Sequence, residues 1–422
     1  MRAPTSFRVF RHGSFAILWS GSLVSNVGTW METVALGRYV QEQTGEAKWA
    51  GLVAAAGFLP TAVVGLLGGA LADRVSRQRL IIVASLLQAT FAGVLTWMVA
   101  AGTATPGWIS LFALLGGCGA AIGFPAWQTA VPDMVPTDEV PAAIGLSSVQ
   151  WNLGRVVGPA LAGIVMSVWG ITAALLCNVV SFFAVTIAAA VVRIPPRVMN
   201  RDDSILRTVA DGWRLTRRVP ALRVMSASMW LSYLLAAPFI ALIPAMVDQV
   251  LQAGRGANSA LVTAQGIGAV TAGVLLGSIV ARWGLRHTMV RLMCLLAPAL
   301  VAYGLAPNIW WMAPALAVVG AAYMGCLSTF STIGQTRAPD SARGRVMAIN
   351  NATLGVLYPI GAVAQGALGD RVGLRTVTVG AGVLMLLVML AVRVMRPGFT
   401  APLGVQFTEP SSNGDAVPTQ RQ

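Results

Sequence analysis

Long apolar segments alternate with short polar ones along the chain, from Phe15 to Met395. A helix that crosses a bilayer needs about 20 apolar residues, because each residue advances about 1.5 Å along the helix axis. By this criterion the pattern predicts twelve membrane-spanning helices. Their expected ranges are 15–39, 49–72, 80–101, 108–130, 142–168, 171–192, 222–247, 260–281, 287–306, 309–334, 346–369 and 374–395.

An arginine-rich polar segment divides these helices into two groups of six. We therefore predict an all-α membrane protein with two six-helix bundles. The expected divisions are an N-terminal bundle at 1–192, a cytoplasmic linker at 193–221, a C-terminal bundle at 222–396 and a disordered cytoplasmic tail at 397–422.

The linker and the two groups carry further patterns. In 205–219 the apolar side chains fall on one side of a helix, which favours an amphipathic helix on the bilayer surface; a solvated linker is the alternative.

The two groups of helices share a repeated pattern: the proline and glycine residues at 136, 158, 163 and 170 recur 203 positions later. Such parallel repeats are typical of transporters with a central site between two bundles.

The composition supports a membrane protein, since 56% of the 422 residues are hydrophobic and 10% are charged. A soluble domain has about 25% charged residues, which its surface requires. The composition therefore excludes a soluble enzyme and a disordered protein. The net charge of +14 is spread in short groups along the chain, so no nucleic-acid partner is predicted.

The basic residues also predict the orientation in the membrane. With the N-terminus inside, the cytoplasmic segments carry 23 Lys and Arg residues and the outside loops carry 4. Segments rich in Lys and Arg stay on the cytoplasmic side. We therefore expect both termini in the cytoplasm.

A charged motif follows the second predicted helix and contains Gly69, Asp73, Arg74 and Arg77. Gly69 permits close helix packing, and Asp73 can pair with an arginine or face a helix N-terminus. With the leucine and alanine at 71 and 72, the segment resembles the G-x-L-a-D-r-x-G-r-k signature of the major facilitator superfamily. Ser76 stands where that signature has glycine.

This motif predicts a gate on the cytoplasmic side. We expect Asp73 to face the start of the eleventh helix near Arg345, and Arg77 to reach Asp133. Their pairing would stabilise the outward-open state and break when the protein opens inward. In the alternative, Asp73 is only a topological anchor.

A second motif lies in the fifth predicted helix and contains Gly154, Gly158, Pro159 and Gly163. Glycines at this spacing, with a proline between them, permit close packing and a bend. The segment is similar to the G-x-x-x-G-P-x-x-G-G motif of superfamily antiporters, which implies an exporter. A packing face found in any transporter is the alternative.

Three further segments, at 23–28, 131–136 and 343–350, narrow the resemblance. With them the chain resembles the branch of the superfamily that contains macrolide-efflux proteins and the enterobactin exporter. This resemblance implies a bacterial cytoplasmic membrane protein that exports drug-like or siderophore-like molecules.

Glu32 and Arg155 are charged residues deep inside predicted helices. Glu32 is the only carboxylate well within a span, and Arg155 lies about 20 Å into the fifth helix. A charge in lipid must be paired, neutralised or hydrated. Glu32 is therefore a candidate proton carrier, with Arg155 nearby to modulate it; a static Glu32–Arg155 pair and a shallow, solvated Glu32 are the alternatives.

The resemblance also implies a central cavity lined by the first, fourth, seventh and tenth helices. Aromatic side chains with few fixed charges suit amphipathic substrates. The candidate cavity residues are Asn26, Trp30, Trp127, Gln128, Trp230, Tyr233, Ser328 and Phe330.

Together these features predict a secondary active transporter, not an enzyme. It is expected to export a small amphipathic molecule by alternating access, coupled to proton entry. The chain has no G-x-x-x-x-G-K-[ST] sequence, so ATP is not expected to be the energy source within this chain. The expected partners are the substrate, protons and membrane lipid, and the expected state is a monomer. The Cys and His residues show no paired spacing, so no metal or cofactor is predicted. An uptake permease of the same fold and a non-transporting receptor or assembly subunit are the alternatives.

Overall fold

The computed structural model describes residues 5–194, 205–339 and 343–404, and these residues are almost entirely helical. The elements before the linker are η1 (Thr5–Arg11), α1 (Gly13–Thr44), α2 (Ala47–Arg74), α3 (Arg77–Ala100), α4 (Pro106–Ala130), η2 (Pro132–Met134), η3 (Thr137–Glu139) and α5 (Val140–Val191). The later elements are α6 (Ile205–Arg218), α7 (Pro220–Leu231), η4 (Ser232–Ala236), α8 (Phe239–Met246), η5 (Val247–Leu251), α9 (Arg255–Leu305), α10 (Ile309–Arg337), α11 (Arg343–Val372), α12 (Leu374–Met395) and η7 (Ala401–Gly404).

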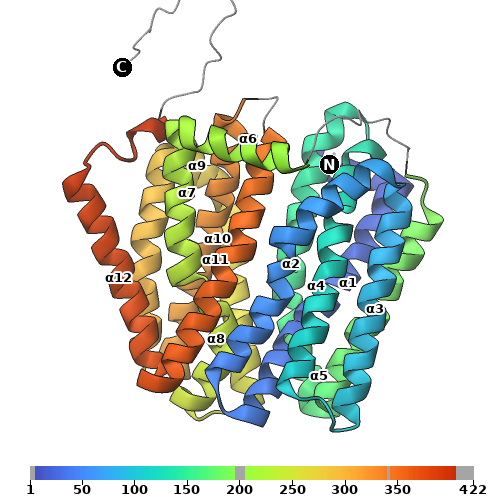
Figure 1. The fold of residues 1–422 in the computed structure, drawn as a ribbon, viewed down its shortest axis with the longest axis horizontal. Coiled ribbons are helices and arrows are strands. Elements are labelled where there is room, and N and C mark those ends of the chain that lie inside the picture. The colour runs from blue at the N-terminus through green and yellow to red at the C-terminus, as the bar shows by residue number, and fades with distance from the viewer. Residues whose placement is uncertain (1–4, 195–204, 340–342, 405–422) are drawn as a thin grey trace, which may run out of the picture.

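The long helices stand side by side, with α1–α5 on one side of the molecule and α7–α12 on the other (Figure 1). Helices α2 and α11 pack against each other between these two groups. The short helix α6 lies across one end, near the N-terminus. We call this end the α6 end and the opposite one, which holds the α1–α2 turn and η5, the distal end.

Eight helical segments among the described residues are long and apolar enough to cross a membrane. Two of them, α5 and α9, each contain one glycine with a non-helical backbone, Gly170 at φ 84° and Gly284 at φ 72°. Such positive φ values favour glycine. These glycines separate helices that the apolar pattern predicts individually. The total of twelve spans stays a prediction.

The seventh predicted helix, 222–247, is not continuous. It consists of α7, the π-helical turn η4, α8 and a second π-helical turn, η5. Pro238 and Pro244 lie in this segment. Because proline has no amide hydrogen and its ring clashes with the preceding turn, it interrupts the regular hydrogen-bond ladder. Hydropathy alone does not register this interruption.

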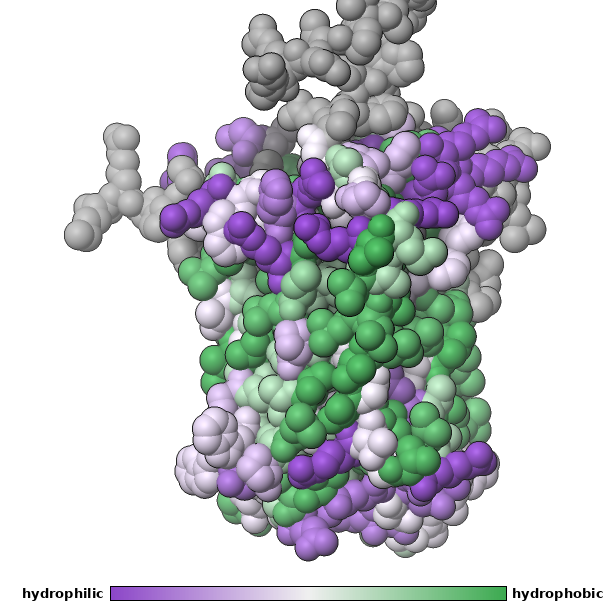
Figure 2. All heavy atoms as spheres, turned by 90° about the vertical axis from the view of Figure 1, so that its left-hand side faces the viewer, coloured by the Kyte–Doolittle hydropathy of each residue, from purple (hydrophilic) through white to green (hydrophobic). Residues whose placement is uncertain are grey.

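On the face shown in Figure 2, a belt of apolar side chains covers the middle of the molecule and polar side chains gather at both ends. On α12, Leu384, Leu387 and Leu390 are 49%, 57% and 59% exposed. Water would disfavour such a continuous apolar surface, whereas lipid accommodates it. The chain is therefore a multi-pass membrane protein.

The linker forms the helix that its apolar pattern predicts. On α6, Trp213 stacks on Trp230 with ring centroids 6.2 Å apart, and the guanidinium of Arg217 lies 5.0 Å from the Trp213 ring centre. A Cβ at Gly212 would lie 3.0 Å from the backbone oxygen of Arg345 in α11. The helix therefore packs on the ends of α7 and α11, so the solvated-linker alternative is wrong.

The tail is ordered for part of its length. Leu403 is 1% exposed, and its carbonyl oxygen accepts a hydrogen bond from Arg337 Nη2 at 2.9 Å. Arg286 Nε donates to Thr400 Oγ1 at 3.2 Å. The predicted disorder is therefore wrong for 397–404, because buried apolar and polar contacts hold this segment at the α6 end. Residues 405–422 lie outside the described residues.

Helices α9 and α10 pack closely through glycines. A Cβ at Gly268 would lie 1.8 Å from the Ala317 carbonyl oxygen, and one at Gly320 would lie 2.2 Å from that of Gln265. Small residues let helix backbones approach closely in membranes, where the hydrophobic effect between helices is weak. The glycine contacts therefore fix the distance between these two helices.

We predict that Gly268→Ala destabilises the protein by about 1–3 kcal/mol, because the backbone of α10 must move to admit the methyl group. Gly273 lies in the same helix, and a Cβ added there would have nothing within 4 Å. Gly273→Ala is therefore the matched control, and it should stabilise the helix by up to about 1 kcal/mol. Thermal unfolding of the two purified variants measures the difference; equal midpoints would contradict the packing argument.

Candidate functional site

The carboxyl group of Glu32 lies where α1 packs against the part of α5 that follows Gly170. Asn178 Nδ2 donates a hydrogen bond to Glu32 Oε2. Asn178 is fully buried, and Ser181 Oγ donates to its backbone oxygen at 2.7 Å. A Cβ at Gly28 would lie 2.1 Å from Ser181 Oγ, so glycine is what allows this close approach. The three polar residues therefore form one group at the α1–α5 contact.

Arg155 lies in the part of α5 that precedes Gly170, and it is 4% exposed. Its guanidinium carbon is 5.2 Å from the centre of the Trp30 ring, and its Nη1 is 3.6 Å from Met324 Sδ in α10. Its Nε has no hydrogen-bond partner among the described residues. An aromatic face attracts a guanidinium through its quadrupole, more strongly where water is excluded. Trp30 therefore supplies part of the stabilisation that a carboxylate would otherwise give.

No ion pair joins Glu32 to Arg155 in the part of the chain that the structure describes. The static-pair alternative is therefore wrong. The partner of Glu32 is the neutral amide of Asn178, 146 residues away in sequence. Asn178 is the one asparagine in the predicted span 171–192, and an amide side chain in an apolar helix was a signal that could have identified it.

The glycines of the second motif are contact points for two neighbouring helices. A Cβ at Gly154 would lie 2.9 Å from Asn26 Cβ, and one at Gly158 would lie 2.5 Å from Trp30 Cβ, both in α1. A Cβ at Gly163 would lie 2.4 Å from Ser259 Cβ in α9. Pro159 lies within α5 beside these contacts. The motif thus packs α5 tightly against both α1 and α9.

At the α6 end, Arg77 contacts the residue that the sequence predicts. Its Nη1 lies 2.6 Å from Asp133 Oδ2 and also donates to the Thr129 carbonyl oxygen at 2.6 Å. Arg77 is 6% exposed, whereas the Asp133 side chain is 30% exposed. Gly69, Asp73 and Arg74 belong to α2, but their side chains lie outside the described residues. The expected approach of Asp73 to Arg345 therefore stays a prediction.

The eight candidate cavity residues differ in how far they are exposed. Tyr233 and Phe330 are 4% and 1% exposed and belong to the hydrophobic core in this conformation, and their place in a substrate cavity stays a prediction. Tyr233 lies in η4 and Phe330 in α10, and both are buried because they pack in the same hydrophobic core.

The remaining candidates differ in their surroundings. Trp127 Nε1 donates to Ser22 Oγ at 2.9 Å, which links α4 to α1. Trp230 is 47% exposed and stacks on α6. Asn26, Trp30 and Ser328 are half-buried and Gln128 is exposed. Among the described residues, no group of three or more His, Cys, Asp or Glu side chains is placed to hold a metal ion.

Comparison with known proteins gives consistent matches over most of the chain. A family model described as "Transmembrane secretion effector" matches residues 4–402. Macrolide efflux protein A of Streptococcus pyogenes is 26% identical over 374 residues, which cover 86% of this chain and 90% of that protein. The multidrug efflux pump Tap of Mycolicibacterium fortuitum is 25% identical over 394 residues, covering 89% and 94%.

Solved structures share the fold at lower sequence identity. A bacterial homologue of the human lysosomal transporter Spinster, in an inward-facing conformation, superposes with a TM-score of 0.72 at 14% identity and covers 97% of this chain and 100% of its own. The nucleoside transporter NupG superposes with a TM-score of 0.74, also at 14% identity, covering 90% and 99%.

The Arg77–Asp133 pair allows a stability test. Arg77→Gln should destabilise the protein by about 3 kcal/mol, because it leaves the Asp133 carboxylate without its cation. Asp133→Asn should cost less, about 1–2 kcal/mol, because Arg77 keeps the Thr129 carbonyl oxygen. Denaturant unfolding of purified protein measures both.

Asp138→Asn is the matched control for this pair, because Asp138 is an exposed acid in the same loop. Its free energy of unfolding should change by less than about 0.5 kcal/mol. If all three variants unfolded at the same denaturant concentration, the pair would contribute nothing to stability.

Proposed function

Because the chain belongs to the transmembrane secretion effector family of the major facilitator superfamily, whose relatives named above are efflux transporters, we propose that it exports a macrolide-like or other amphipathic drug-like molecule in exchange for protons. The chain is a membrane transporter and not an enzyme. The proposal concerns the substrate, the coupling ion and the mechanism. Its main support is the hydrogen bond between Glu32 and Asn178.

The Glu32–Asn178 contact suits a carboxyl group that changes its protonation state. An amide N–H can donate to an oxygen of either a carboxylate or a carboxylic acid. An arginine partner would instead favour the ionised form strongly. Since the partner of Glu32 is the neutral Asn178, the contact can persist in both forms. A proton can therefore bind when water reaches the site from one side and leave when water reaches it from the other.

Arg155 gives the same region a fixed positive charge, because arginine keeps its proton. It lies on Trp30, two residues before Glu32 in α1, so a rotation of α1 against α5 changes the distance between the two charges. Such a change couples protonation of Glu32 to the rearrangement of the two helix groups. Because Gly154 and Gly158 pack closely against α1, a movement of α5 relative to α1 would directly change the surroundings of Arg155 and Trp30.

The substrate class follows from the relatives and from the side chains near this site. The relatives export macrolides or several drugs, according to their names. Trp30, Trp127 and Trp230 offer large apolar surfaces with one polar group each, which suit amphipathic molecules. These features favour drug-like substrates over siderophores.

The proposed topology has twelve spans in two six-helix bundles, as a monomer in the bacterial cytoplasmic membrane. The α6 end is assigned to the cytoplasm, because the arginines of α6 and Arg77 lie there and basic segments stay inside. With this orientation, Glu32 lies nearer the outer side than the inner side of α1.

Glu32→Gln should abolish efflux driven by a pH gradient, because glutamine cannot bind and release a proton. Downhill exchange of substrate across the same membrane should continue, since it needs no net proton movement. Proteoliposomes loaded with a radiolabelled macrolide measure both activities.

Glu46→Gln serves as the control for Glu32, because Glu46 pairs with Lys48 at the exposed distal end. It should leave both activities unchanged. A Glu32→Gln protein that still concentrates the macrolide against its gradient when a pH difference is imposed would show that Glu32 is structural and that coupling occurs elsewhere.

Asp73→Asn tests the cytoplasmic gate. If Asp73 contributes about 1.4 kcal/mol to the outward-open state, its loss should slow transport about tenfold while the amount of protein in the membrane stays normal. Asp138→Asn, an exposed substitution at the same end, should transport at the normal rate. Unchanged transport by Asp73→Asn would leave Asp73 as a topological anchor.

A further inference from the structure

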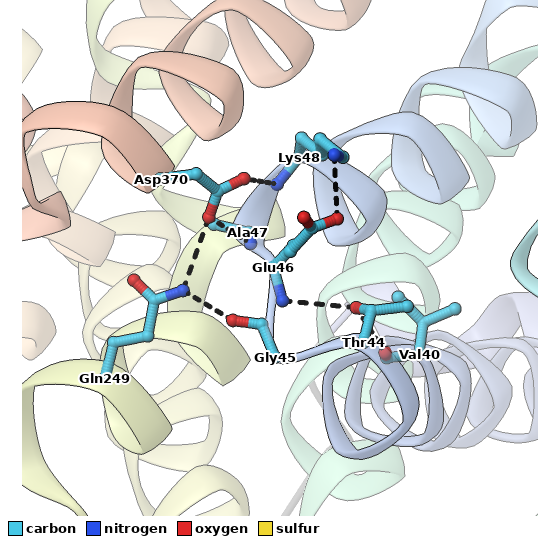
Figure 3. Close-up of polar contacts among 8 residues, drawn as sticks. All are labelled: Val40, Thr44, Gly45, Glu46, Ala47, Lys48, Gln249 and Asp370. Carbon is cyan, nitrogen blue, oxygen red and sulfur yellow. Dashed lines mark hydrogen bonds and ion pairs between the residues drawn. The ribbon is translucent and has the colours of Figure 1, made fainter.

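The distal end of the molecule carries a set of polar contacts between the two helix groups (Figure 3). Asp370, in the last turn of α11, accepts hydrogen bonds from the backbone amides of Ala47 at 2.7 Å and Lys48 at 2.9 Å. These amides are the first two of α2. The first amides of a helix have no partner within the helix, and the helix dipole favours a negative charge beside them. Asp370 therefore caps a helix that belongs to the other group.

Neighbouring contacts close the same end. Gln249 Nε2, in η5, donates to the Gly45 carbonyl oxygen at 2.9 Å and lies 3.4 Å from Asp370 Oδ1. Arg38, near the end of α1, forms an ion pair with Asp248 of η5. A Cβ at Gly366 would lie 2.8 Å from the Ala47 carbonyl oxygen, so glycine allows α11 to approach the start of α2. Apart from the one between Gln249 and Asp370, these contacts join α1, α2 or the turn between them to η5 or α11.

The sequence around Asp370 repeats the charged motif of α2. Residues 366–373 read G-A-L-G-D-R-V-G, and residues 69–76 read G-A-L-A-D-R-V-S, so six of eight positions are identical. In both segments the aspartate lies in the last turn of its helix. The two helices run antiparallel, because Gly366 contacts Ala47 while Gly355 contacts Ala62. The two copies of the motif therefore lie at opposite ends of one helix pair.

We infer that Asp370 is a gate residue of the distal end, and that α2 and α11 carry one copy of the same aspartate gate at each end. At the distal end, Asp370 of α11 caps the start of α2 and holds that end closed. At the α6 end, the register brings the last turn of α2, with Asp73, beside the first turn of α11. Opening one end separates its cap while the other end closes, so each aspartate shifts the equilibrium in the opposite direction.

This gate accounts for why the distal contacts use the backbone of α2 and not one of its side chains. A backbone amide cannot rotate away, so the cap forms only when the start of α2 and the end of α11 are in their closed positions. Water hydrates both the carboxylate and the amides once they separate, because Asp370 lies at an exposed position. The contact is therefore reversible within a transport cycle.

The test measures which end of the purified full-length chain is open, in lipid nanodiscs. The four native cysteines, at 118, 177, 294 and 326, are replaced by alanine. Val247→Cys then places a thiol beside Asp248 at the distal end, and Val131→Cys places one close to Asp133 at the α6 end. Both valines are buried, at 0% and 4% exposure. A water-soluble maleimide labels the thiol at 247 only while the distal end is open. The thiol at 131 is buried among Val9, Phe15 and Leu146 of its own helix group, so it is labelled only when that group loosens.

Asp370→Asn should increase the labelling rate at position 247 about fivefold, because the amide side chain lacks the charge that the α2 N-terminus favours. The rate at position 131 should not increase, since the opening of the distal end leaves the packing inside that helix group unchanged. Asp370→Glu should restore part of the closure. Arg371→Gln, which removes a charge from the neighbouring exposed position, should leave both rates unchanged.

Two results would overturn the proposal. Unchanged labelling at position 247 in Asp370→Asn would mean that the cap does not hold the distal end. Equal increases at positions 247 and 131 would mean that the substitution loosens the whole fold. The experiment uses no substrate and no pH gradient, so its outcome does not depend on what the protein exports or on which ion drives it.

Discussion

The cost of placing a charge or an unpaired polar group in lipid determines how this chain is organised. The bilayer core offers no water to hydrogen-bond backbone groups, so helices that satisfy their own backbone are the only stable spans here. Charged side chains accordingly gather at the two ends of the molecule, and the belt between them is apolar (Figure 2). The two charged residues deep in the helices, Glu32 and Arg155, are exceptions that each require a specific neighbour. Exceptions of this kind are where function is expected in a membrane protein.

The same constraint explains why glycine defines the contacts between helices. Since apolar side chains gain little by leaving lipid for another apolar surface, helices associate through close van der Waals contact of their backbones. Gly154 and Gly158 bring α5 onto α1, Gly268 and Gly320 join α9 to α10, and Gly366 brings α11 onto α2. Such contacts contain few interlocking polar groups. One helix can therefore rock on another without leaving a hydrogen bond unsatisfied in lipid.

The apolar pattern predicts helices well because hydropathy reports which segments cross the membrane. It does not report local interruptions, and so the breaks in 222–247 were missed although Pro238 and Pro244 are visible in the sequence. The Arg77–Asp133 contact was predictable, because the motif that carries Arg77 has a recognisable spacing. Asn178 was recognisable as the one asparagine of its span, but its contact with Glu32 was not predictable, since hydropathy leaves open which face of one helix meets which face of another. The order in 397–404 was missed for a related reason: a polar composition does not reveal the buried contact of one leucine, Leu403.

The location of the charged contacts also follows from what a transporter must do repeatedly. An ion pair that is fully buried is strongly destabilising to break, by about 3–5 kcal/mol, because a charge is left without water. A contact at the membrane surface is easier to open, because water replaces the lost partner. Asp248 and Asp370 keep part of their side chains exposed at the distal end, whereas the middle of the α2–α11 contact combines close backbone approaches with the ring contact of Phe58 and Tyr358. The free energy that holds the distal end closed can therefore be set by exposed carboxylates, which separate from their partners at low cost, while the apolar middle of the α2–α11 contact is the surface on which the two groups of helices rock.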